Sequence, residues 1–181
     1  MFEIVWENQA SEEFLAILEF WNNHNGSNSY SRKLFTEINK RNVYYGSYVE
    51  QIRDMFARKQ ESLKKQDDKF FSKYWQVYAW AAIIGFINDK REEGVELPNQ
   101  SSFQYQMISN GSESIANALL LMAIGKVKAK EAKDILNSRK LLTIISEYAE
   151  GGAKHILEIR QTPGYERKFD SPDDYLIEIV K

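Results

Sequence analysis

The residues best suited to chemistry in this chain surround a double glycine. The pair Gly151-Gly152 is flanked by Glu147, Glu150 and His155. A histidine with carboxylates can bind a metal or act as a general acid–base pair. The alternative is structural, since small residues let another helix approach closely while the charged side chains stay solvated. The chain has only 2 histidines, and we favour the structural interpretation.

Acidic pairs offer a second candidate site. Asp67-Asp68, and Asp173-Asp174 with Asp170, could suggest a divalent cation, which needs several oxygens brought together. Both pairs stand where a helix should begin, and acids there compensate the helix dipole. The chain has no Walker loop, GxGxxG or GxSxG. It also has no cysteine, so thiolate catalysis and Cys-based zinc sites are excluded. We therefore expect no catalytic residue, no metal and no cofactor.

Two clusters of basic residues could reach an outside partner. Acids are interleaved in both, which favours solvated helix surfaces with i, i+4 pairing. The alternative is contact with a phosphate backbone, with the nearby Tyr44, Tyr45 and Tyr48 able to stack on bases. The candidate nucleic-acid-binding residues are Arg53, Arg58, Lys59, Lys64, Lys65, Lys126, Lys128 and Lys130, continued by Lys69, Lys73, Lys133, Arg139 and Lys140.

Length and composition indicate one globular domain. The 181 residues contain no low-complexity tract, so we expect a single domain over residues 1–181, with a possible arm at 1–10. A chain of this size buries about 70% of its unfolded surface and needs no disulfide. Acids stand at the N-terminus where a secretory signal needs cations, which predicts a cytoplasmic protein. A net charge of -2 gives no global attraction to nucleic acid.

Two segments are expected to form the centre of the fold. The apolar run Val77 to Ile87 is bracketed by charge and is shorter than the roughly 20 residues that span a bilayer. It predicts a helix, about 69–90, that is buried on nearly all sides. The second segment is a helix from Leu141 to Gln161 with one apolar face. Gly152 on that face should pack closely against the small residues around Gly85, whereas Gly151 should lie off it.

Further helices are predicted along the rest of the chain. They cover Ser11–Trp21, Ser31–Lys40, Tyr45–Lys65, a segment opening at Ser112, Ala129–Asn137 and Asp173–Val180. Phe2–Trp6 and Ser102–Ile108 could be short strands or extended segments. Six to eight helices with at most a short strand pair make an all-α, single-domain helical bundle.

The two central segments also carry a family resemblance. The stretches that carry it are YWQVYAWAAIIGFINDKREEGVELP and ILNSRKLLTIISEYAEGGAKHIL. Both resemble the small accessory proteins called DNA phosphorothioation-associated protein 4. The resemblance covers Phe70 to Leu157. It departs at 88–91, where Asn-Asp-Lys-Arg stands in place of Gly-Lys-Arg, and residues 1–45 have no counterpart. It implies a setting in bacterial antiphage defence and supplies no catalytic residue.

The expected function follows from the resemblance and from the absence of an active-site signature. We expect a non-enzymatic accessory or assembly subunit of a bacterial antiphage defence complex, acting through protein–protein contacts. Its partners would be other protein subunits of the system, with DNA reached through the complex and no membrane involved. High aromatic content, 13%, suits a dense core or an interface. The alternative is a DNA-binding module that uses the basic helix surfaces.

Overall fold

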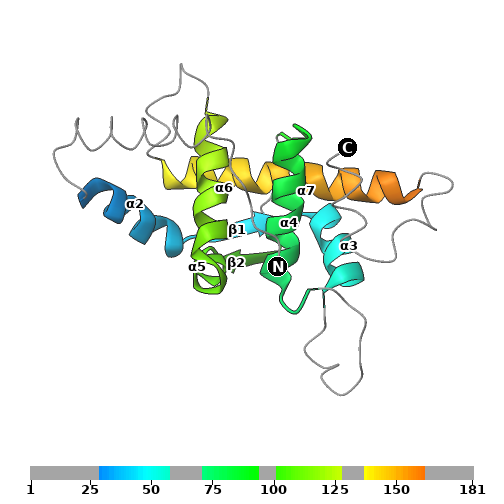
Figure 1. Ribbon diagram of the computed structural model, residues 1–181, viewed down its shortest axis with the longest axis horizontal. Helices are drawn as coiled ribbons and strands as arrows, with labels where there is room; N and C mark the ends of the chain where they lie inside the picture. The colour runs from blue at the N-terminus through cyan, green and yellow to red at the C-terminus, as the bar shows by residue number, and fades with distance from the viewer. Residues whose placement is uncertain (1–28, 58–70, 94–100, 128–136, 162–181) are drawn as a thin grey trace. The chain divides into compact units, whose positions relative to one another are not determined.

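The computed structural model describes residues 29–57, 71–93, 101–127 and 137–161 (Figure 1). Contacts divide the chain into two units, Met1–Glu37 and Ile38–Lys181, and each is considered by itself. The expectation of one domain with an N-terminal arm stays a prediction. Four predicted elements lie outside the described residues, except that one of them reaches these residues at Asn137. They are Phe2–Trp6, Ser11–Trp21, Ala129–Asn137 and Asp173–Val180.

The described residues form six helices and one two-stranded antiparallel sheet, which confirms the all-α expectation with a short strand pair. None of these helices combines the length and apolarity needed to cross a membrane. In chain order the elements are α2 (Ser29–Asn39), β1 (Asn42–Tyr45), α3 (Ser47–Phe56), α4 (Tyr74–Ile87), β2 (Ser101–Gln104), α5 (Gln106–Gly111), α6 (Glu113–Gly125) and α7 (Ser138–Gln161).

The packing of α4 against α7 forms the core of the second unit. Helix α4 is buried on nearly all sides, as its apolar run predicts. It makes its most extensive contact with α7, which α6 and α3 also contact (Figure 1). A Cβ on Gly152 would lie 2.6 Å from the Gly85 backbone nitrogen, closer than non-bonded carbon and nitrogen tolerate. The predicted close approach at Gly152 and Gly85 is therefore confirmed.

Gly151 was expected to lie off the contact face, and this prediction is wrong. The residue is buried, and a Cβ there would lie 2.8 Å from the backbone nitrogen of Arg91 and would overlap the carbonyl of Lys90. The chain that leaves α4 folds back onto α7 at this point. It does so through Asp89, whose φ of 48° lies in the left-handed region that asparagine and aspartate tolerate better than most residues. Both glycines are thus contact positions, one against α4 and one against the segment after it.

The sheet joins two segments about 60 residues apart. The strand expected near Ser102 is present as β2, and its partner is β1, paired from Asn42↔Gln104 to Tyr45↔Ser101. The segment Asn42–Tyr45 alternates between exposed and buried positions, the period of a half-buried strand. Gly46, in extended geometry, is the N-cap of α3, so this helix begins after Tyr45 and not at it.

The end of α3 also differs from expectation, and one further helix was not predicted. Helix α3 ends at Phe56 and does not continue to Lys65, because Ala57 is extended and forms a bridge with Phe71. Helix α6 opens at Ser112 as predicted, and the Ser112 hydroxyl accepts a hydrogen bond from the amide of Ile115 at 3.3 Å. Helix α5, just before it, was not predicted. Its preceding residue, Tyr105, is buried and donates its hydroxyl to a carbonyl of α6 at 2.6 Å.

Candidate functional site

The carboxylate of Glu150 has a structural role. It is almost fully buried and accepts hydrogen bonds from the backbone amides of Gly46 and, at 3.2 Å, Tyr48. These amides belong to the start of α3, where orphan N–H groups need a partner. Burial raises the pKa of Glu150, and the amide hydrogen bonds oppose this effect. The expectation that this side chain is solvated is wrong, since it caps α3 from α7.

Glu147 and His155 are held by other neighbours. Glu147 is buried and pairs with the Arg91 guanidinium at 2.6 Å, while that guanidinium also lies over the Tyr148 ring. His155 is half-buried, and burial followed by the charge of Lys90 lowers its pKa. Within the described part of the chain, no group of three or more acidic or histidine side chains could hold a metal ion. Glu147 and Glu150 therefore make contacts within the fold, with Arg91 after α4 and with the start of α3.

Only two of the eight predicted nucleic-acid-binding residues lie in the described ranges. Arg53 pairs with Asp54 at 3.0 Å and donates to the Tyr45 hydroxyl at 3.2 Å. Lys126 pairs with Asp89 at 2.6 Å. Both cations are thus paired with acids of the same chain. The remaining six, Arg58, Lys59, Lys64, Lys65, Lys128 and Lys130, lie outside the described residues.

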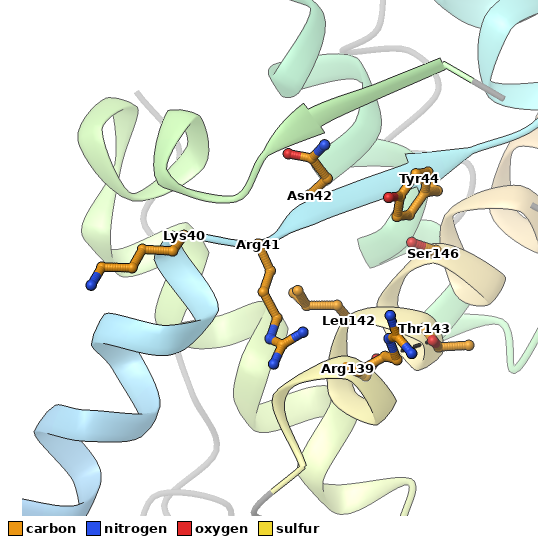
Figure 2. Close-up of a pocket in the computed structure, with 8 residues that line it drawn as sticks. All are labelled: Lys40, Arg41, Asn42, Tyr44, Arg139, Leu142, Thr143 and Ser146. Atoms are coloured by element: carbon orange, nitrogen blue, oxygen red, sulfur yellow. Dashed lines mark hydrogen bonds between the residues drawn. The ribbon is translucent and has the colours of Figure 1, made fainter. Parts of the chain in front are cut away.

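The structure brings a different set of cations together around a hollow of about 580 Å³. One wall is the segment that enters and forms β1, and the other is the first turns of α7 (Figure 2). In Figure 2 the guanidinium groups of Arg41 and Arg139 lie on either side of Leu142, and the Lys40 side chain extends away from them. The residues that line this basic hollow are Lys40, Arg41, Asn42, Tyr44, Arg139, Leu142, Thr143 and Ser146.

The electrostatics of the basic hollow favour an anion. The charged side chains in its lining are Lys40, Arg41 and Arg139, and all three are cations. The hollow also lies at the N-terminal, positive end of the 24-residue helix α7. The first turn of α7 contains no acid and instead carries Arg139 and Lys140. Cations at this end cost a helix roughly 0.3–1 kcal/mol where acids would stabilise it. A local sequence choice that opposes stability is typical of a functional position.

The floor and rim of the hollow supply hydroxyl and aromatic groups. Ser146 is buried and shares a hydrogen bond of 3.1 Å with the buried hydroxyl of Tyr78. Thr143 donates to the Arg139 carbonyl at 3.0 Å. At the rim, Tyr44 is 42% exposed, and its ring lies across from Ser146 (Figure 2). The hollow therefore combines cations, hydroxyl groups and an accessible aromatic ring.

The sequence carries separate signals for parts of this site. Tyr44 is a candidate for stacking and Arg139 extends a basic cluster, but about 95 residues separate them along the chain. Arg41 belongs to neither basic cluster. The sequence signal that points to this site is the run of cations, without an acid, at the start of α7.

Comparison with protein-family models, with curated proteins and with solved structures gives no match to this chain. The resemblance to the phosphorothioation-associated proteins therefore stays a prediction.

Proposed function

We propose that this protein is a non-enzymatic accessory subunit that binds nucleic acid through the phosphate groups, at the basic hollow. The observation that carries the proposal is the convergence of Arg41 and Arg139 on one hollow at the positive end of α7. Guanidinium groups bind phosphate oxygens in a fork geometry, which adds direction to the charge attraction. The setting in antiphage defence rests on the family resemblance alone.

Binding to a phosphate polymer agrees with the modest net charge of the chain. A formal charge of -2 provides no long-range attraction over the whole molecule, so affinity must come from a local patch. Few phosphates are then neutralised, and the dependence on salt is shallower than for a strongly basic protein. We expect weak binding by the isolated protein, as suits a subunit that acts within a complex.

The test is titration of a labelled oligonucleotide at low salt with the wild type and with Arg139→Glu. The substitution removes a cation from the hollow and places an acid in the first turn of α7, where it should stabilise the helix. We expect lower affinity together with an unchanged or higher melting temperature, so that loss of folding cannot explain the loss of binding. Lys90→Glu, on an exposed lysine outside both the hollow and the predicted basic clusters, is the matched control and should bind as the wild type does. Failure of the wild type to bind any oligonucleotide at low salt would end the proposal.

A second candidate function is assembly through protein contacts, the function first expected from the sequence. The supporting observation is a set of large apolar side chains that remain exposed on the second unit. They are Tyr44, Met55, Tyr74, Ile87 and Met107.

Co-purification from the native host should separate the two candidates. If assembly is the main function, the tagged chain should recover a stoichiometric protein partner after nuclease treatment. A partner lost on nuclease treatment would instead be bridged by nucleic acid, which supports the first proposal. Met55→Ser or Met107→Ser should weaken a direct protein contact and leave oligonucleotide binding intact.

A further inference from the structure

We propose that the basic hollow takes one unpaired nucleotide, with its base stacked on Tyr44 and its phosphate held by Arg41 and Arg139. This inference rests on the proposed function and specifies its ligand as single-stranded nucleic acid. Three observations carry it: the exposure of the Tyr44 ring, the size of the hollow and the hydroxyl groups on its floor.

The Tyr44 ring is available because of its place in the sheet. Strand β1 turns Val43 and Tyr45 into the core and Tyr44 outward. The residue paired with Tyr44 on β2 is Ser102, which is too small to cover an aromatic ring. A ring that is 42% exposed on a hollow that two arginines also line is a stacking platform of the kind that single-strand-binding proteins use. Stacking requires a base with a free face, which an intact duplex does not offer along its length.

The size of the hollow suits a single nucleotide. Its volume of about 580 Å³ lies within the roughly 300–1,000 Å³ of small-molecule sites, whereas a duplex would contact only the rim. The cations lie on the α2–β1 connection and α7, and the aromatic ring lies on β1. A base on the ring and a phosphate between the guanidinium groups would place the sugar over Leu142 and Ser146.

The floor can donate a hydrogen bond to the ligand. The Ser146 hydroxyl lines the hollow and meets the buried Tyr78 hydroxyl at 3.1 Å. When Tyr78 donates to Ser146, the Ser146 proton is free to point to a ligand oxygen. Because a sugar or phosphate oxygen is present in every nucleotide, this contact adds affinity without selecting a base.

The test compares an oligonucleotide as a single strand, as a duplex and as the same single strand with abasic sites. The wild type should bind the single strand most tightly. Tyr44→Ala should reduce single-strand affinity by roughly 5- to 150-fold, the range found for loss of one stacked base. Tyr44→Phe, which keeps the ring, should bind nearly as the wild type does. With the abasic strand, Tyr44→Ala should cost nothing further, because there is no base to lose.

The outcomes separate this inference from the function it rests on. Equal affinity for single strand and duplex, with no effect of Tyr44→Ala and a clear effect of Arg139→Glu, would overturn the single-nucleotide inference and leave phosphate binding intact. Absence of binding by all three nucleic acids at low salt would overturn both. A loss of affinity in Tyr44→Ala that is equally large on the abasic strand would show that the ring supports the fold of β1 and does not stack, which also overturns the inference.

Discussion

Replacing Gly152 by alanine should destabilise the protein, although alanine is the better helix former. Gly152 lies in α7 at a close crossing with α4. An added Cβ would overlap the Ala81 carbonyl and lie 2.6 Å from the Gly85 nitrogen. Both are backbone atoms of α4, so no side chain can rotate aside. The two helices themselves must separate to accept one methyl group.

The expected magnitude is the difference of two terms. Alanine in place of a helical glycine gains about 0.8–1.0 kcal/mol of helix propensity. Overpacking a well-packed core costs typically 1–3 kcal/mol, and a clash with backbone belongs near the top of that range. The net loss should be about 1–2 kcal/mol. Since 1 kcal/mol shifts the melting temperature of a chain of this size by about 2–4 °C, a fall of about 2–8 °C should be visible in a thermal melt.

The assay is thermal and urea unfolding followed by circular dichroism, with Gly125→Ala as the matched control. Gly125 ends α6, and nothing lies within 4 Å of a Cβ added there. Gly125→Ala should therefore gain up to about 1 kcal/mol from propensity alone. Gly151→Ala should behave like Gly152→Ala, because its Cβ meets the backbone after α4. If Gly152→Ala melts at or above the control, the close approach of α4 and α7 is wrong.

Three further predictions concern charged side chains. Burial raises the pKa of Glu150 above its ordinary 4.5. The contribution of Glu150 to the free energy of unfolding is therefore full below pH 4.5 and is lost as the pH rises through the pKa of the folded state. Melts from about pH 4 to about pH 8 should show the wild type losing stability relative to Glu150→Gln, and a constant difference would contradict this. Arg91→Ala leaves the largely buried Glu147 carboxylate without its cation and should cost about 1.5–3 kcal/mol in urea unfolding. Adding Glu147→Gln should recover part of that loss, whereas no recovery would show that the Arg91 stem and not its charge matters. The hydrogen bond from Lys126 lowers the pKa of Asp89 below its ordinary 3.8. The stabilisation that the Asp89 carboxylate gives the fold is therefore present above pH 3.8 and is lost as the pH falls through the pKa of the folded state. An NMR titration should show this carboxyl returning toward 3.8 in Lys126→Met, and an unchanged pKa would exclude the pairing.

The central helix pair could be predicted because its signals are local. An unbroken apolar run predicts the all-round burial of α4, and small residues on one face of α7 predict the close approach at Gly152. The cap at Ser112 is likewise encoded by neighbouring residues. These features depend on spacing within a single helix, which a sequence states directly.

The errors arose where the partner lies far away in sequence. Strand β1 has only four residues, and its pairing with β2 comes about 60 positions later. Glu150 looked solvated because the amides that it caps, at Gly46 and Tyr48, lie about 100 residues earlier. Gly151 looked harmless because helix spacing does not reveal the chain that folds back beyond α4. The basic hollow combines both difficulties, since β1 and the start of α7 must meet before Arg41 and Arg139 share a site.

The most direct test of the central claim is the salt dependence of oligonucleotide binding by the wild type and by Arg139→Glu. A plot of log affinity against log salt concentration, from about 50 mM to 200 mM, gives a slope that counts the phosphates neutralised, at about 0.7 per contact on a single strand. If Arg139 holds a phosphate in the hollow, the variant should bind more weakly, and its slope should be shallower by about that amount. Identical slopes and affinities for the two proteins would contradict the claim that this hollow binds nucleic acid.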